Sequence, residues 1–158
     1  SGGVGSTLEV TSTSPSSLTL DFSSYSIDQT DVVVNCDSDI IFSGSTVDTN
    51  SLTISGTTGC VVGMDLNGIT GASSPVTVTD STLRVTSSVD QVVKAPITLI
   101  GTAVLDTVAG VKYILSGSDL TLQDFSSFFA TPTIVLDSTA STFTVETSTN
   151  INIDLQSA

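Results

Sequence analysis

Two aspartates that flank one serine have a spacing suited to chemistry. Asp37 and Asp39 lie on either side of Ser38, between an apolar stretch that ends at Cys36 and another that begins at Ile40. Carboxylates so spaced could bind Ca²⁺ or act as a paired acid and base. The alternative, which we favour, is a solvated turn in which each aspartate bonds to the local backbone.

A second pair, Asp80 and Asp137, occupies equivalent places in two similar segments. Each aspartate follows an apolar stretch and precedes a Ser-Thr pair, in segments 75–85 and 132–145. If the segments stacked directly, the two carboxylates would repel unless a cation lay between them. A turn role is available to each aspartate alone, and we favour it. We keep all four aspartates as Ca²⁺ candidates and expect no other cofactor.

The two cysteines, Cys36 and Cys60, allow two interpretations. An even pair in a chain rich in Ser and Thr is compatible with a disulfide and an oxidising compartment. Two buried free thiols that act as small apolar residues are the alternative.

The sequence offers little for nucleophilic catalysis. There is no histidine to act as a base for a serine, and no Gly-x-Ser-x-Gly elbow, phosphate-binding loop or Cys/His zinc cluster occurs. A Ser–Lys pairing with Lys94 or Lys112 is left open. We therefore expect a non-enzymatic protein.

The charge is strongly one-sided and limits the partners. The formal net charge is −13, from 16 acidic residues against three cations, Arg84, Lys94 and Lys112. Binding of nucleic acid or of an anionic membrane needs a Lys/Arg patch, which three scattered cations cannot form. No apolar run approaches the roughly 20 residues of a spanning helix, so we expect no membrane insertion. Such an acidic surface suits a saline or calcium-containing exterior.

Short alternating strands are the elements that position these residues. Segment 75–85 holds two strands joined by an Asp-Ser-Thr turn, and copies recur at 132–145 and, with Gly101-Thr102 at the turn, at 96–105. Similar strands start at intervals near 20 residues, at Val32, Leu52, Val76, Ile97, Leu120, Thr133 and Ile151. This rhythm predicts an all-β fold, a β-solenoid whose coils stack on one continuous core. A two-sheet β-sandwich or jelly roll is the alternative.

Several details follow from the solenoid interpretation. Outward Ser and Thr residues should stack in ladders and exchange hydroxyl hydrogen bonds. Residues 124–130 should form a short helical turn with Asp124 as N-cap, and 150–155 the last strand. We expect residues 1–17 to be a flexible or strand-exchanging arm and 18–158 one all-β domain. The predicted inward-facing residues are Val76, Val78, Leu83, Val85, Ile97, Leu99, Val104, Ile134, Leu136, Phe143 and Val145.

The repeated strands with Ser-Gly-Ser, Ser-Gly-Thr and Asp-Ser-Thr turns resemble two groups of known proteins. These are the β-helical shafts of viral tail fibres and tailspikes, and the passenger domains of secreted bacterial adhesins, over residues 32–155. The resemblance implies an extracellular, cell-surface or virion-surface location. Catalytic members carry acidic pairs with basic or aromatic substrate contacts, from which this chain departs, since it has no Trp and three cations.

Three functions are compatible with this pattern. The first is a structural or assembly protein, such as a viral appendage or extracellular filament component, that forms homo-oligomers or filaments through β-edges. The second is an adhesin or a receptor- or glycan-binding module, and the third a polysaccharide-acting enzyme with an Asp pair. The aromatic candidates for ligand contact are Tyr25, Tyr113, Phe125, Phe128 and Phe129, of which the phenylalanines more often belong to a core or end cap.

Overall fold

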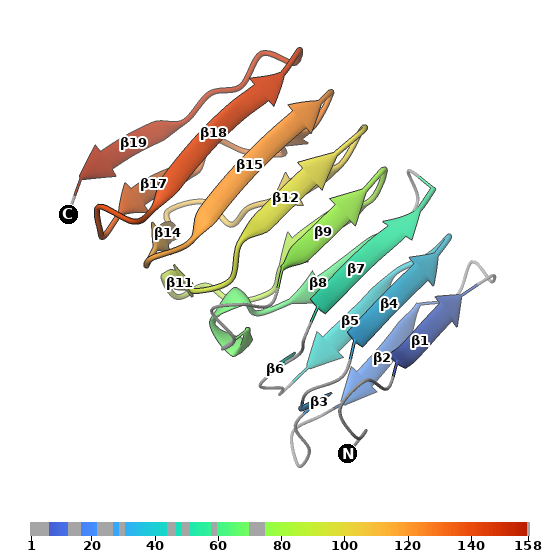
Figure 1. The fold of residues 1–158 in the computed structure, drawn as a ribbon. Helices are drawn as coiled ribbons and strands as arrows, with labels where there is room; N and C mark the ends of the chain where they lie inside the picture. Colours follow the sequence, from blue (N-terminus) through green and yellow to red (C-terminus); the bar gives the residue numbers. More distant parts are fainter. Residues whose placement is uncertain are drawn as a thin grey trace.

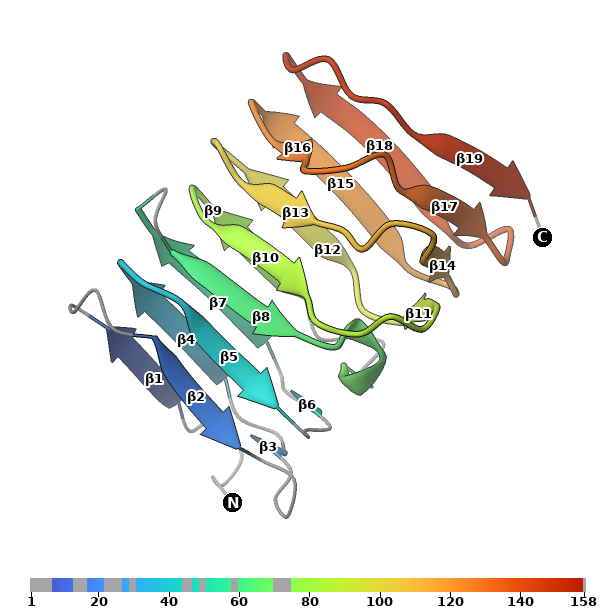
Figure 2. The same cartoon turned by 180° about the vertical axis from the view of Figure 1, so that it is seen from behind.

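The chain forms a parallel β-solenoid of about six turns. The computed structural model places the coils in sequence order, with residues 7–12 and 154–157 at opposite ends of the stack (Figure 1, Figure 2). Neighbouring strands pair in parallel from the first coil to the last. The predicted solenoid is confirmed, and the sandwich is wrong because its sheets would be antiparallel. The structure describes residues 7–12, 17–21, 27–28, 31–43, 47–48, 51–57, 60–69 and 75–157.

Each coil contributes strands to successive faces. The seven-stranded sheet has the order β1 (Thr7–Ser12), β4 (Asp31–Cys36), β7 (Ser51–Gly56), β9 (Val76–Thr79), β12 (Ile97–Ile100), β15 (Asp119–Asp124) and β18 (Thr142–Thr147). The six-stranded sheet has the order β16 (Ser127–Phe128), β13 (Val104–Asp106), β10 (Thr82–Val85), β8 (Val61–Met64), β5 (Ile40–Ser43) and β2 (Leu18–Asp21).

The third face is less regular. Its four-stranded sheet has the order β11 (Gln91–Val93), β14 (Lys112–Leu115), β17 (Thr133–Leu136) and β19 (Asp154–Ser157). In the earlier coils this face holds the pair β3 (Ile27–Asp28) and β6 (Val47–Asp48), and then the 3₁₀ turn η1 (Leu66–Gly68). No helix in the described part of the chain is long and apolar enough to cross a membrane.

The spacing predicted from sequence matches the coil length. Asp31 pairs with Ser51, a step of 20 residues, and Leu52 with Val76, a step of 24. Five of the predicted strand starts lie in one row across the seven-stranded sheet: Val32, Leu52, Val76, Ile97 and Leu120. The other two differ, because Thr133 begins β17 on the third face and Ile151 precedes the last strand, which runs from Asp154 to Ser157 instead of over 150–155.

Alternation builds the core. Seven predicted inward residues are buried: Val76, Val78, Leu83, Val85, Ile97, Leu99 and Ile134. Val104 is wrong, because its neighbours Ala103 and Leu105 fill the core and a strand places alternate residues on opposite faces. Leu136 and Phe143 are only partly buried and Val145 is exposed.

The three similar segments do not all stack. Segments 75–85 and 96–105 are direct neighbours, with β9 beside β12 and β10 beside β13. Segment 132–145 instead runs from β17 to β18, from the third face to the first. Asp80 and Asp137 therefore lie at different corners of the coil, and the direct stacking that would have made their carboxylates repel does not occur.

Two other local predictions concern the helical turn over 124–130 and the arm over 1–17. The helical turn over 124–130 is wrong, because Asp124 ends β15 with a positive φ of 58° and Ser127–Phe128 is strand β16. Within the predicted arm 1–17, Thr7–Ser12 is β1 and pairs with β4. Residues 1–6 and 13–16 lie outside the described residues, and exchange of this segment with another chain stays a prediction.

The outward ladders are present in part. A central row of the seven-stranded sheet begins with Glu9 and Val33 and continues with five threonines: Thr53, Thr77, Thr98, Thr121 and Thr144. Side-chain hydrogen bonds join neighbouring coils in the flanking rows, where Ser55 Oγ donates to Asn35 Oδ1 at 2.6 Å and Gln123 Nε2 donates to Glu146 Oε2 at 2.9 Å. In the central row, the predicted exchange of hydroxyl bonds is absent from the described residues.

Candidate functional site

A disulfide joins two coils at the corner between the first two faces. Cys36 ends β4 and Cys60 precedes β8, with their Cα atoms 5.1 Å apart and both side chains buried. Gly56 lies beside the bond, where a Cβ would meet the Cys36 carbonyl oxygen and come within 2.8 Å of Cys60 Cβ. A glycine at this position therefore lets the two coils approach closely.

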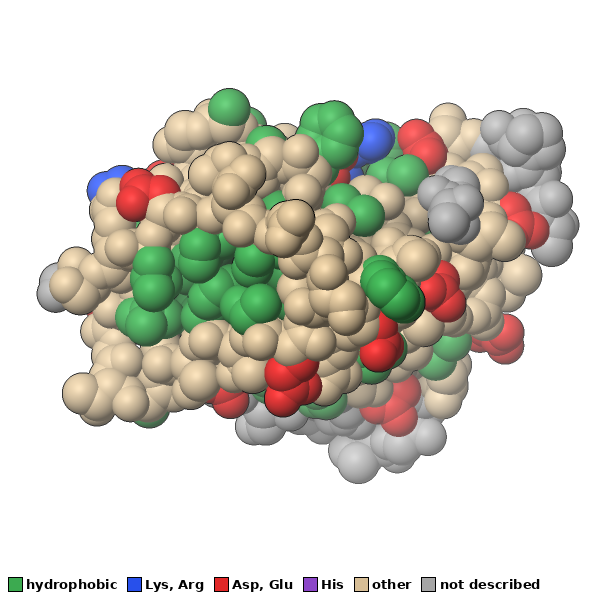
Figure 3. All heavy atoms as spheres, turned by 90° about the horizontal axis from the view of Figure 1, so that it is seen from above, with side chains coloured by type: hydrophobic (Ala, Val, Ile, Leu, Met, Phe, Trp, Pro, Cys, Tyr) green, Lys and Arg blue, Asp and Glu red, His purple; other side chains and the backbone are tan. Residues whose placement is uncertain are grey.

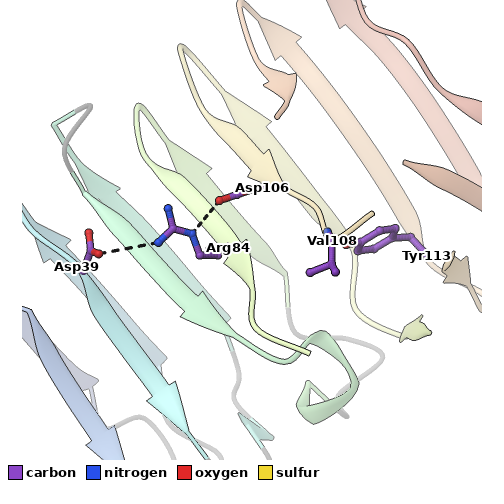
Figure 4. A network of polar contacts seen from close by, with 5 residues as sticks. All are labelled: Asp39, Arg84, Asp106, Val108 and Tyr113. Carbon is purple, nitrogen blue, oxygen red and sulfur yellow. Dashed lines mark hydrogen bonds and ion pairs between the residues drawn. The ribbon is translucent and has the colours of Figure 1, made fainter. Parts of the chain in front are cut away.

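Asp37 and Asp39 follow β4 at the same corner. Arg84 Nη1 lies 3.9 Å from Asp39 Oδ2, and Arg84 Nε donates to Asp106 Oδ2 at 2.7 Å (Figure 4). The Arg84 side chain is 48% exposed, so these ion pairs contribute roughly 1 kcal/mol or less each. The guanidinium charge beside Asp39 disfavours a second cation there.

Asp80 has a structural role at a corner of the coil. Asp80, Gly101 and Asp124 have φ angles of 52°, 68° and 58° in three successive coils. Asp80 Oδ1 accepts hydrogen bonds from Thr102 N at 2.9 Å and Thr102 Oγ1 at 3.2 Å, and Asp124 Oδ2 accepts from Gly101 N at 3.2 Å. Each carboxylate thus satisfies backbone of the neighbouring coil. An added Cβ on Gly101 would collide with the Asp80 carboxylate.

The four Ca²⁺ candidates do not form one site. Asp37 and Asp39 lie between β4 and β5, Asp80 between β9 and β10, and Asp137 is exposed after β17. Within the ranges that the structure describes, no three acidic or cysteine side chains group so that they could hold a metal ion.

The aromatic candidates divide into core and surface. Tyr113 is buried, and its hydroxyl accepts a hydrogen bond from Val108 N at 3.1 Å (Figure 4). Burial raises the pKa of Tyr113, the charge of Asp106 adds to this, and the Val108 bond opposes it. Phe128 packs against Phe143 with ring centroids 6.3 Å apart. Phe125 and Phe129 are exposed, and Tyr25 lies outside the described residues.

A cleft of about 170 Å³ lies between the last two coils. It is lined by residues 128–131 and 150–152, none of which is charged. The last coil has no strand in the six-stranded sheet opposite β16, which leaves this space beside the chain. The cleft therefore holds no carboxylate pair for acid–base chemistry.

Gln91 is a buried polar residue that sequence reasoning missed. Its Oε1 accepts hydrogen bonds from Leu66 N at 2.8 Å and Asn67 N at 3.4 Å, and its Nε2 donates to Val89 O at 2.7 Å. It therefore satisfies the 3₁₀ turn η1 from the next coil. No spacing in the sequence marks this role, because the partners are backbone groups.

The C-terminal end of the solenoid exposes its own core. In the rows that run along the axis, Leu122 is 0% exposed but its neighbour Val145 is 46% exposed, and Ile134 is 0% exposed but Leu155 is 53% exposed. Figure 3, which looks onto this end, shows hydrophobic side chains gathered there. We call Phe143, Val145 and Leu155 the C-terminal end face. Their inward orientation follows from the alternation, but the alternation alone does not show which inward residues another strand covers.

The strands of this end face are also sheet edges. β18 is the last strand of the seven-stranded sheet and β19 the last of the four-stranded sheet, while β1 and β2 are edges at the opposite end. An edge strand presents a row of backbone N–H and C=O groups to another strand. Each of these edges could therefore accept a further strand.

No family model matches the sequence, and comparisons with curated proteins and with solved structures found no match. The class of protein is accordingly defined by the fold, a parallel β-solenoid.

Proposed function

We propose that this chain is a non-enzymatic structural component that joins copies of itself through strand edges at the ends of its solenoid. The C-terminal end face carries the proposal. Coils of a solenoid bury their apolar side chains against the neighbouring coil, so an exposed apolar face at the end of the stack favours contact with a further coil. Here the face holds Val145 and Leu155, about half exposed, beside the unpaired edges of β18 and β19. Both features favour pairing with a further strand.

The setting that we propose is extracellular, on a cell surface or on a virion. The disulfide between Cys36 and Cys60 supports an oxidising compartment. The resemblance to tail-fibre shafts and adhesin passenger domains supports a rigid, rod-like part. A net charge of −13 makes copies repel at low salt, so association should strengthen as salt screens the charge.

Light scattering behind size exclusion, with negative-stain images of the same fractions, tests the proposal. We expect the mass to rise with protein concentration and Val145→Asp to return the chain to monomer, because the new carboxylate would be buried in the contact. Val89→Asp is the matched control, since Val89 is 59% exposed on the side of the solenoid and its change should leave the mass unaltered. A strict monomer at all concentrations, with and without Ca²⁺, would contradict self-association.

A second candidate is binding of a glycan or receptor. It is favoured by Phe129 and Phe125, which are 78% and 64% exposed, since exposed aromatic rings are common contact residues. A glycan array with wild type and a Phe125→Ala, Phe129→Ala double variant tests it. Binding that the double variant loses would support this function.

A further inference from the structure

The two ends of the seven-stranded sheet match each other. β18 and β1 are both six-residue edge strands, and they lie at opposite ends of the same parallel sheet (Figure 1). A copy of the chain moved along the axis would therefore offer β1 to β18 in the direction that all other pairs in this sheet use.

The alternation of the two strands fixes one register. Two inward rows are apolar wherever a coil is described: one runs from Leu8 to Phe143 and the other from Val10 to Val145. Placing Leu8 of a second copy beside Phe143 continues the first row, and the same step places Val10 beside Val145. A slip by one residue would set these apolar side chains opposite polar ones.

The outward residues in this register are also compatible. Glu9 of the second copy would lie beside Thr144, and Glu146 beside Thr11, so each carboxylate faces a hydroxyl donor and no like charges are directly opposite. Pairing of a carboxylate with a neutral donor already occurs in the sheet, where Gln123 Nε2 donates to Glu146 at 2.9 Å. Glu9 and Glu146 are diagonal neighbours in this register, so added salt should strengthen the contact.

We propose that the C-terminal end face is covered by the N-terminal coil of a second copy, head to tail and in this register. This inference rests on the proposed function and specifies its partner and geometry. Because the contact joins two different surfaces by translation, it does not close and generates a filament. Within such a filament, β1 of each copy pairs with β4 of its own chain on one side and with β18 of the preceding copy on the other.

A tail-to-tail dimer is the competing geometry. A two-fold axis across the end would pair β18 with its own copy, antiparallel, but would also bring β19 against residues 148–153 of the partner, which form no strand. Head-to-tail contact instead lets the seven-stranded sheet continue and places β19 toward the same face of the next copy. The sheet topology therefore favours head-to-tail stacking.

Cysteine pairs distinguish the two geometries. Thr144→Cys and Glu9→Cys are made on separate copies of the full chain, mixed, oxidised mildly and analysed by non-reducing electrophoresis and peptide mass spectrometry. The native cysteines are already paired and buried. We expect the mixture to give at least about tenfold more cross-linked dimer than either variant alone, because the register holds the two thiols at high effective concentration. A 9–144 peptide should carry the bond.

Thr53→Cys mixed with Thr144→Cys is the control, because Thr53 lies in the same outward row but far from either end. It should give no more cross-link than Thr144→Cys alone. Dominant 144–144 dimers, or oligomers by light scattering without a 9–144 bond, would overturn the head-to-tail register while leaving self-association intact. Monomers throughout would overturn both proposals.

Discussion

At the scale of single residues, Ser126 has a buried hydroxyl without a hydrogen-bond partner among the described residues. It lies in a row with Ser81 and Ala103, and Ser81 Oγ donates to Thr79 O at 2.7 Å. Ser126→Ala should therefore raise the free energy of unfolding by about 1 kcal/mol, because an unsatisfied buried polar group is removed. Ser81→Ala should lower it by a similar amount. Urea unfolding measures both, and a loss of stability in Ser126→Ala would contradict the assignment.

Tyr113 links stability to alkaline pH. Its pKa is raised from 10.0 by burial, so above about pH 10 the unfolded chain loses this proton before the folded chain does. The unfolded state then binds fewer protons, and the free energy of unfolding falls as pH rises from 10 through the folded pKa. Below pH 10 this group contributes no slope. Urea unfolding between about pH 8 and pH 11 measures the effect.

Tyr113→Phe is the comparison for that measurement. Other groups titrate alike in both proteins, so the alkaline fall should be smaller in the variant. At about pH 8 the variant should be less stable by about 1 kcal/mol, because Val108 N loses its acceptor. Parallel pH profiles for the two proteins would show that Tyr113 ionises normally.

At the scale of elements, period-two alternation sufficed to place most strands and most of the core. The core rows repeat along the axis, so Val76, Ile97 and Leu120 are recognisable one by one and by their spacing. Corners could not be predicted in the same way. Aspartate is a common N-cap residue, which is why a helical turn was expected at Asp124. Its positive φ and the hydrogen bond that its side chain accepts from Gly101 N depend instead on the preceding coil.

The candidate sites were harder to predict for the same reason. The sequence left the state of Cys36 and Cys60 open, because their proximity depends on which coils are neighbours. Cys36 pairs with Gly56 in the next coil, and Cys60 follows four residues later. The similarity of segments 75–85 and 132–145 suggested equivalent places for Asp80 and Asp137. The structure instead places the same local pattern at different corners of the coil. Gln91 and the end face depend on tertiary neighbours that local composition does not reveal.

At the scale of the whole molecule, the charge of −13 must be considered together with the axial stack. Parallel coils hold the outward carboxylates at fixed positions, and only three cations offset 16 acidic residues. Repulsion among them lowers the stability of the folded state at low salt. Added salt should relieve it, because the Debye length falls from about 30 Å at 0.01 M to about 8 Å at 0.15 M.

We therefore expect the melting temperature to rise with NaCl by several degrees and then level off, at protein concentrations where the chain is monomeric. CaCl₂ and MgCl₂ at equal concentrations should act alike, because screening depends on valence, whereas a Ca²⁺ site would stabilise further by mass action. Thermal unfolding followed by circular dichroism measures both effects. A larger shift with Ca²⁺ that disappears in an Asp37→Asn, Asp39→Asn variant would locate a calcium site at that turn, despite the Arg84 charge nearby.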